Sequence, residues 1–343
     1  MAYSINAKDY FNTKLYTGNA TARTISGIGF QPDWVWGKSR TNTENNSIFD
    51  AVRGAGYDIK SDANNAQASN SGITAFNSDG YVLGTADSLN SNGQSFVTWN
   101  WKANGAGSAN TDGDINSTVS ANTTSGFSIV NYTGTLSGSG NPTVGHGLGV
   151  APAVIIIKSA SNGENWGVQH TSLPANYLLQ LNTTSAQINS ASQGTLTAPT
   201  SSVFTVNYSG EWGNSGQNYI AYCFAEKTGF SKFGSYTGNA NADGAFVYTG
   251  FKPAWLLIKK ASASGEDWRL YDSKRLGYNP QNNQININTT NAEYSATQLD
   301  LLSNGFKLRA TDGGLNGSSA TYIYMAFAEA PLVGTNNVPA TAR

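Results

Sequence analysis

Short runs of hydrophobic residues alternate with clusters of Gly, Asn and Ser along the whole chain. FSIVNYTG (127–134), YLLQLN (177–182) and QININTT (284–290) alternate with a period of two, which is the pattern of half-buried strands. VIIIK (154–158) is continuously apolar, as expected for a central strand that is covered on both faces. We find no segment of helical length with a convincing helical period. The sequence therefore predicts an all-β protein.

The same blocks of sequence occur three times in the same order, about a hundred residues apart. The clearest block is GFQPDWVWGKSR (29–40), which matches GVAPAVIIIKSA (149–160) and GFKPAWLLIKKA (250–261). Several blocks in register indicate three copies of one unit. The residues that define the repeat are Tyr16, Tyr132, Tyr236, Pro32, Pro152, Pro253, Trp166, Trp268, Trp101, Phe224 and Phe327.

Each copy contains six or seven strand-like runs, which favours a two-layer antiparallel sandwich of jelly-roll type. A unit of about a hundred residues can bury a core of its own. We therefore expect three tandem antiparallel β-sandwich repeats, joined by a polar linker and flanked by two arms. The expected boundaries are 1–11 for the N-terminal arm, 12–103 for repeat 1, 104–122 for a flexible linker rich in Gly, Ser, Asn and Thr, 123–227 for repeat 2, 228–331 for repeat 3, and 332–343 for the C-terminal arm.

The last strand of each repeat has one bulky face and one small face. Trp99 and Trp101 alternate with Thr98 and Asn100, so the two tryptophans share a face. The other two copies place large residues at the same positions and mostly alanine between them. A face of small residues permits close approach of a second sheet or a second repeat.

The charge and the apolar pattern exclude several classes of protein. Charged residues are 12% of the chain and the net charge is −1, so nucleic-acid binding is not expected. No apolar run approaches the length of a membrane-spanning helix, so we expect no insertion into a membrane. The start, MAYSINAKDYFN (1–12), lacks the basic and apolar regions of a secretory signal. We expect synthesis in a host cytoplasm.

The reactive side chains do not form a recognisable catalytic motif. His146 and His170 are the two histidines, and neither stands beside a nucleophile or an orienting acid. Cys223, in an apolar strand, reads as an inert core residue. We predict no enzyme activity and no cofactor. A glycan-cleaving tailspike is a less favoured alternative, because two facing carboxylates cannot be excluded from sequence.

Asp112 and Asp114 form a weak candidate for calcium. They lie in a segment of alternating oxygen-bearing side chains, which suits calcium, but the twelve-residue loop with a terminal Glu is missing. An Asp-Gly-Asp turn without metal is the favoured interpretation of the pattern. We therefore predict no metal site.

Trp212 differs from the other tryptophans, because no Trp matches it in the other repeats and it lies in a polar loop. Such an aromatic ring, together with Asn214 and Gln217, could stack on and bind a sugar. The alternative is a side chain folded back onto its own sandwich. If the loop binds glycan, replacing Trp212 should weaken binding without changing the melting temperature.

The repeat blocks resemble a domain of unknown function that is common in predicted tail-fibre and other virion proteins of marine bacteriophages, cyanophages included. The resemblance rests on segments such as GFSIVNYTG (126–134), GAFVYTGFKPAWLLIKK (244–260), LSNGFKLR (302–309) and YIYMAFAEAP (322–331), and it covers about residues 12–331. It implies a virion protein displayed on the particle surface, of tail-fibre or receptor-binding type. No catalytic residues come with this resemblance.

Several partners and assemblies remain open at this stage. The expected partners are other virion proteins and a host cell-surface glycan or protein. A fibre or tip protein would form a homotrimer, but three repeats in one chain could instead form a pseudo-threefold monomer. A capsid-decorating, head-fibre, cement or tail-structure subunit without a receptor role is the main alternative function.

Overall fold

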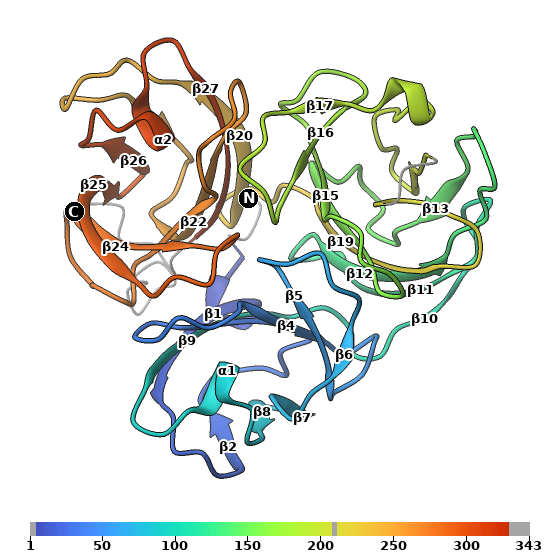
Figure 1. Cartoon of the computed structure of the whole chain (residues 1–343), viewed down its shortest axis with the longest axis horizontal. Helices are drawn as coiled ribbons and strands as arrows, with labels where there is room; N and C mark the ends of the chain where they lie inside the picture. Colours follow the sequence, from blue (N-terminus) through green and yellow to red (C-terminus); the bar gives the residue numbers. More distant parts are fainter. Residues whose placement is uncertain (1–4, 208–210, 329–343) are drawn as a thin grey trace.

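Three lobes surround a common centre in the computed structural model, which describes residues 5–207 and 211–328 (Figure 1). The first lobe comprises residues 5–103, the second 104–227 and the third 228–328. All paired strands within the sheets are antiparallel, and the helices are single turns. The prediction of an all-β protein is confirmed.

The first lobe consists of two sheets. Its larger sheet follows the order β1 (Phe11–Thr17), β9 (Ser95–Trp101), β3 (Trp34–Ser39), β4 (Ser47–Asp50), β5 (Tyr57–Lys60) and β6 (Ala68–Ser69). Its smaller sheet contains β2 (Arg23–Ser26), β8 (Gly80–Leu83) and β7 (Ile73–Asn77), and its short helices are η1 (Ala7–Asp9) and α1 (Asp87–Asn90).

The second lobe has a sheet of eight strands and a sheet of two. The larger sheet follows the order β10 (Ser108–Asn110), β11 (Ser117–Asn122), β12 (Phe127–Thr133), β19 (Asn218–Phe224), β14 (Val154–Ser159), β15 (Gly167–His170), β16 (Tyr177–Gln180) and β17 (Ile188–Asn189). The smaller pairs β13 (Thr143–Gly145) with β18 (Val203–Thr205), and the short helix is η2 (Ala191–Gln193).

The third lobe is one continuous sheet of eight strands. They follow the order β20 (Ser231–Thr237), β27 (Thr321–Ala328), β22 (Pro253–Lys260), β23 (Arg269–Asp272), β24 (Gln281–Asn286), β25 (Tyr294–Leu302), β26 (Gly305–Leu308) and β21 (Phe246–Tyr248), and the short helix is α2 (Gly313–Asn316).

The three lobes share one strand order. The runs β1-β9-β3-β4-β5, β12-β19-β14-β15-β16 and β20-β27-β22-β23-β24 correspond strand by strand. The register agrees too, because residues aligned by the sequence blocks occupy matching pairs. These pairs are Trp34 with Trp101, Val154 with Phe224, and Trp255 with Phe327.

Bulky apolar side chains from all three lobes meet in one central core. They come from the large face of the last strand of each lobe and from the strand that follows the conserved proline position. Aromatic pairs prefer such offset and edge-on contacts, and they add stability beyond the area that they bury. The ring-centroid distances between lobes include 4.7 Å for Trp34–Tyr222, 5.4 Å for Trp101–Trp255 and 5.8 Å for Phe224–Phe327.

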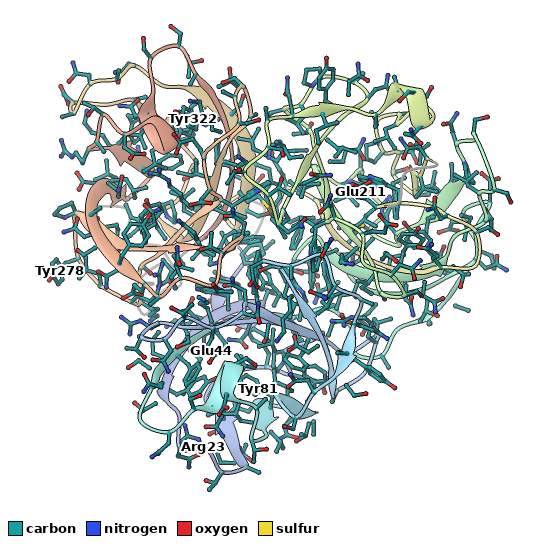
Figure 2. The ribbon with its side chains drawn as sticks, viewed as in Figure 1. Arg23, Glu44, Tyr81, Glu211, Tyr278 and Tyr322 are labelled. Carbon is teal, nitrogen blue, oxygen red and sulfur yellow. The ribbon has the colours of Figure 1, made fainter. Side chains whose placement is uncertain are left out.

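The small face of each last strand lies inside its own lobe. In the second lobe, Ala221 and Cys223 pack in a core with Phe204. In the first lobe, Thr98 meets Tyr81, whose hydroxyl lies 2.9 Å from Thr98 Oγ1. Figure 2 shows Tyr81 within this lobe. Bulky residues therefore join the lobes, and small residues admit the second layer within a lobe.

Two predicted boundaries were wrong. The segment 104–122 is not a flexible linker, because β10 and β11 extend the main sheet of the second lobe. Ile115 and Val119 are buried in the core of that lobe. These two apolar side chains anchor a segment that is otherwise polar. The expected N-terminal arm also belongs to the fold, since Ala7 and Phe11 are buried in the central core.

The three repeat-defining prolines lie where the sequence predicts them, just before or at the start of a strand. Pro32 and Pro152 precede β3 and β14, and Pro253 is the first residue of β22, where a missing N–H donor costs little. The C-terminal arm 332–343 lies outside the described residues.

Replacing Trp34 by Ala should destabilise the whole chain. Trp34 is fully buried and packs against rings of two lobes, so the variant should lose about 3–5 kcal/mol of unfolding free energy. Urea denaturation followed by tryptophan fluorescence measures this loss. Tyr248→Ala, at a side chain that is 66% exposed, should change stability by less than about 0.5 kcal/mol. Equal effects of the two variants would contradict the central role of Trp34.

Candidate functional site

Each lobe donates a side-chain hydrogen bond to a backbone carbonyl of another lobe, and the three bonds close a ring. The donors are Asn46, Trp166 and Trp268, which occupy the same position in the three sequence blocks. The first lobe contacts the third, the second contacts the first, and the third contacts the second. The bonds run from Asn46 Nδ2 to Thr289 O (2.8 Å), from Trp166 Nε1 to Lys60 O (2.7 Å) and from Trp268 Nε1 to Gln180 O (2.9 Å).

A second ring consists of backbone hydrogen bonds between the same neighbours. In each, an N–H donates across a junction to the carbonyl of the residue that ends the Gly-x-x-Pro block. Because the three bonds are equivalent, they show which residues occupy the same position in the three junctions. They run from Gln67 to Ala160, from Gln187 to Ala261 and from Glu293 to Arg40, each at 3.0 Å.

Two of the three junctions contain a buried aspartate–arginine pair. Arg53 Nε donates to Asp50 Oδ2 at 2.5 Å, and the hydroxyl of Tyr222 from the second lobe donates to the same oxygen at 2.8 Å. A buried pair of this kind is tolerated only when its remaining polar atoms are hydrogen-bonded. The corresponding Asp272 accepts from Arg275 Nε at 2.6 Å and from Trp99 Nε1 at 2.9 Å.

The third junction replaces this arrangement with neutral groups. His170 and Leu173 take the places of the aspartate and the arginine, and Met325 takes that of the donor from the neighbouring lobe. His170 Nδ1 accepts from Ser172 N at 3.1 Å, and its Nε2 lies 3.2 Å from Tyr324 O. Burial lowers the pKa of His170 to about 4, so the ring is neutral and structural.

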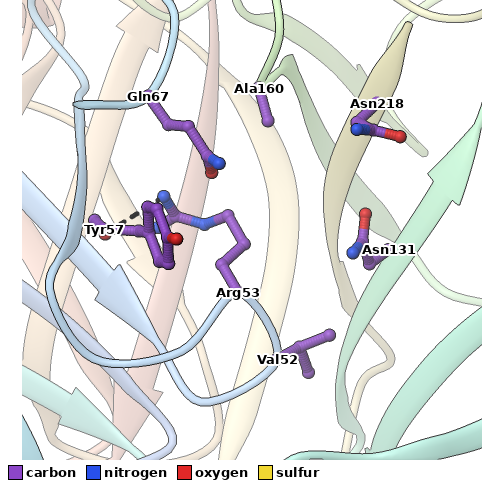
Figure 3. Close-up of a pocket in the computed structure, with 7 residues that line it drawn as sticks. All are labelled: Val52, Arg53, Tyr57, Gln67, Asn131, Ala160 and Asn218. Carbon is purple, nitrogen blue, oxygen red and sulfur yellow. Dashed lines mark hydrogen bonds between the residues drawn. The ribbon is translucent and has the colours of Figure 1, made fainter. Parts of the chain in front are cut away.

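A polar groove lies between the first and second lobes (Figure 3). It has a volume of about 230 Å³. Arg53 and Tyr57 lie on one side of it, and Asn131 and Asn218 lie across from them on β12 and β19. The lining residues are Val52, Arg53, Tyr57, Gln67, Asn131, Ala160 and Asn218.

The side chains around the groove can form several hydrogen bonds with a ligand. The Tyr57 side chain is 42% exposed and offers a ring face, and the amides can both donate and accept. Gln67 Oε1 is buried and has no hydrogen-bond partner among the described residues. With its open volume and polar lining, this groove is our candidate for binding in the described part of the chain.

Trp212 does not line this groove or any surface. It is fully buried within the second lobe, and the hydroxyl of Tyr132 donates to its carbonyl at 2.6 Å. The same tyrosine bond occurs in the other lobes, from Tyr16 to Leu89 O (2.8 Å) and from Tyr236 to Leu315 O (2.7 Å). The predicted sugar-stacking role of Trp212 was wrong, because this residue occupies the core position that is leucine in the other lobes.

Asn214 and Gln217 hold the same connection in place. Asn214 N donates to the hydroxyl of Tyr219 at 2.9 Å, and this hydroxyl lies 3.3 Å from Gln217 Oε1. Gln217 Oε1 also accepts from Ser159 Oγ at 3.3 Å. The two residues therefore support the turn around Trp212 rather than forming a site with an exposed ring.

The weak calcium candidate is held by protein donors. Asp112 accepts from Asn110 Nδ2 at 2.8 Å, and Asp114 accepts from Thr143 N at 2.9 Å and from Thr143 Oγ1 at 2.8 Å. These bonds from Thr143 lower the pKa of Asp114. Within residues 5–207 and 211–328, no three His, Cys, Asp or Glu side chains gather as metal ligands would.

The remaining reactive groups are enclosed by the fold. Cys223 is buried and burial raises the pKa of its thiol, which removes the thiolate that a nucleophile needs. His146 Nδ1 accepts from Leu148 N at 3.2 Å, and its Nε2 lies 3.2 Å from Thr200 O. Burial lowers the pKa of His146. Neither group stands beside the groove.

Three lysines at one repeat position are buried beside the junctions. Lys38, Lys158 and Lys259 each donate to backbone carbonyls, as in the 2.7 Å bond from Lys38 Nζ to Thr290 O. Burial lowers the pKa of all three to about 8. Their ammonium groups satisfy carbonyls that the strand ladder leaves unpaired.

Comparison with known proteins identifies the family. Residues 6–331 match the family described as Domain of unknown function (DUF7483). The chain belongs to this family. The match spans all three lobes, including η1 at the start of the first. No curated protein and no solved structure matches the chain. In the described part of the chain, no helix is long and apolar enough to span a membrane.

The residues of the groove come from positions that sequence comparison did not single out. The blocks align Arg40 with Ala160. A short recurring block, NAQ (65–67), SAQ (185–187) and NAE (291–293), also aligns Gln67 with Glu293, and the backbone bonds across the junctions agree with it. A signal for Trp212 was present, since Leu89-Asn90 and Leu315-Asn316 stand at the same distance before the last strand.

Replacing Trp212 by Ala should unfold the second lobe rather than remove a binding surface. Loss of this buried indole should cost about 3–5 kcal/mol of unfolding free energy, measured by urea denaturation. Trp212→Leu is the matched control, because leucine fills the corresponding place in the other lobes, and it should cost clearly less. An unchanged stability of Trp212→Ala would contradict the assignment of this residue to the core.

The buried lysines should make stability rise with pH between about 8 and 9.5. An unfolded lysine keeps its proton to about pH 10.4, whereas these three begin to release it near 8 in the folded chain. The unfolded state therefore binds more protons in this window, and each lysine adds up to about 1 kcal/mol per pH unit.

Urea titrations at pH 7.5, 8.5 and 9.5 measure this slope. Lys158→Met should lower it, whereas the exposed Lys8→Met should leave it unchanged. The Cys223 thiol opposes the rise from about pH 8.5, where it would ionise in the unfolded chain. Buried tyrosines such as Tyr132, Tyr222 and Tyr271, whose pKa values burial raises, oppose it from about pH 9, so the rise is steepest between pH 7.5 and 8.5. A stability that falls between pH 7.5 and 8.5 would contradict the assignment.

Proposed function

We propose that the protein is a non-enzymatic structural protein of a phage particle, displayed on the particle surface and of tail-fibre or receptor-binding type. The resemblance of its repeat blocks to virion proteins supports this function. The same blocks supply the central core and the contacts between lobes, so the residues behind the resemblance are those that build the body.

The observation that carries the proposal is the closed ring of equivalent contacts between the lobes. We interpret the chain as three copies of one jelly-roll-like β-sandwich, joined head to tail. Head-to-tail contacts form a ring when their rotation closes. Here the side-chain donors stand at the same position in all three lobes, and so do both partners of the backbone bonds. A single chain then supplies the threefold body for which a fibre would otherwise need a homotrimer. We therefore propose a pseudo-threefold monomer.

A role in display rather than catalysis is supported by the state of the reactive groups. In the described residues both histidines bond to backbone atoms, and the cysteine is buried. The polar groove offers amides, a guanidinium and a ring, which are groups that bind rather than cleave. Contact with a host cell surface is the use that we propose for such groups.

A capsid-decorating or other architectural subunit is the second candidate. The threefold arrangement of the lobes favours it specifically, because such a body matches the local threefold positions of a capsid lattice (Figure 1). In that case the protein would bind other virion proteins and need no receptor.

Mass and location test the proposal together. Light scattering after size exclusion should give 36.2 kDa, the mass of one chain, and a mass three times larger would contradict the monomer. Immunogold labelling of purified virions should place the protein at the tail periphery. Label over the head would favour the decorating subunit, and absence from the particle would refute both candidates.

A further inference from the structure

The junction between the third and first lobes is filled by a carboxylate between two guanidinium groups. Glu293 accepts from Arg40 Nη2 at 2.8 Å, from Arg275 Nη1 at 2.8 Å and from Asn283 Nδ2 at 3.0 Å. Charge-assisted bonds of this kind are short and strong. The network occupies the space between the two lobes.

The junction between the first and second lobes has lost half of this network. Ala160 stands where Arg40 stands, and Gln67 stands where Glu293 stands, as their equivalent backbone bonds show. The counterpart of Arg275 remains as Arg53. The groove of about 230 Å³ lies at this place. It lies where the side chain of Arg40 lies in the other junction, whereas Gln67 takes the place of Glu293.

Arg53 keeps a donor directed to this space. Its Nε bonds to Asp50, its Nη2 to Ile48 O at 3.1 Å, and its Nη1 to Tyr57 O at 3.2 Å (Figure 3). Each Nη carries two hydrogens. In the described chain the second Nη1 hydrogen has no protein acceptor, whereas Nη1 of Arg275 meets the carboxylate of Glu293.

The remaining junction lacks this donor. Leu173 replaces the arginine between the second and third lobes, and Gln187 and Ala261 replace the other two members. Among the described residues, only the junction between the first and second lobes combines a guanidinium with a neutral Gln in place of the Glu and an Ala in place of the second Arg.

We propose that this groove binds a sugar that carries a carboxylate, of the hexuronate class. The carboxylate lies beside the Gln67 amide, in the space that Ala160 leaves open, and accepts from Arg53 Nη1. The Gln67 amide N–H donates to the ligand, and Asn131 and Asn218 bind its hydroxyls. The ring of Tyr57 covers one face of the sugar.

The volume of the groove matches one sugar ring within it, and a longer glycan would extend from its open side. Pockets for drug-sized ligands occupy about 300–1,000 Å³, and this groove is smaller. Gln67 is neutral and does not repel a carboxylate, whereas a glutamate at the same position would. The site rests on the proposed function, because host contact is the use proposed there for this groove. Sugar binding by the isolated chain is nevertheless measured without reference to where the protein stands on a particle.

Calorimetric titration of the full chain with sodium D-galacturonate tests the site, with D-galactose and acetate as comparison ligands at equal ionic strength. Galacturonate should bind at least about tenfold more tightly than either, because only it combines a carboxylate with a hydroxylated ring. Equal binding of galactose, or no binding of galacturonate, would overturn the proposal.

The double variant Gln67→Glu/Ala160→Arg rebuilds the network of the other junction within the groove. It should remain folded, and it should bind galacturonate at least about tenfold more weakly than the original chain. The two introduced side chains fill the groove. Undiminished binding by this variant would therefore overturn the proposal, because the sugar would have to bind elsewhere.

Two further variants decide the question if the double variant does not fold. Tyr57→Ala removes the ring from a partly exposed position and should weaken binding several-fold. Tyr177→Ala removes the corresponding ring at the junction that lacks the arginine, and it should leave binding unchanged. Equal effects of the two substitutions would overturn the proposal.

Discussion

The packing of aromatic rings at the centre of the molecule is the interaction on which the rest of the structure depends. Trp34, Trp101 and Trp255 lie fully buried where the three lobes meet, and Phe224 and Phe327 complete the contact. Aromatic side chains bury large areas and tolerate few arrangements, so they fix both the energy and the relative position of the lobes. The junction hydrogen bonds can form only because this packing brings each lobe against the next.

The three junctions use equivalent positions but place different side chains at them. Asp50 with Arg53 and Asp272 with Arg275 are buried ion pairs with an added donor from the neighbouring lobe. His170 stands in the corresponding neutral junction, where its ring bonds to backbone atoms. Because a buried charge must be paired, all members of such a set have to change together. In the junction between the first and second lobes, Arg53 remains, but Gln67 stands where Glu293 meets Arg275 in the other junction. The groove lies at this place.

Much of the fold could be predicted from sequence, since strand periodicity and repetition are visible in the residues themselves. The strands and the core role of Phe224 followed from alternation. The position of Trp212 did not, because a Trp replaces a leucine there and polar neighbours hide the equivalence. The segment 104–122 was misjudged because Ile115 and Val119 are its only large apolar residues, whereas backbone pairing of β11 with β12 adds it to the sheet. The groove could not be foreseen, because it depends on side chains from two lobes meeting across a junction.

Native-state hydrogen exchange tests most directly whether the three lobes form one body around a shared core. The account predicts that amides of the central strands β3, β14 and β22 exchange only through a common global opening, with one free energy for all three lobes. A lobe whose central strand exchanged with its own, clearly lower free energy would contradict it, because that lobe would then open without disturbing the shared aromatic core.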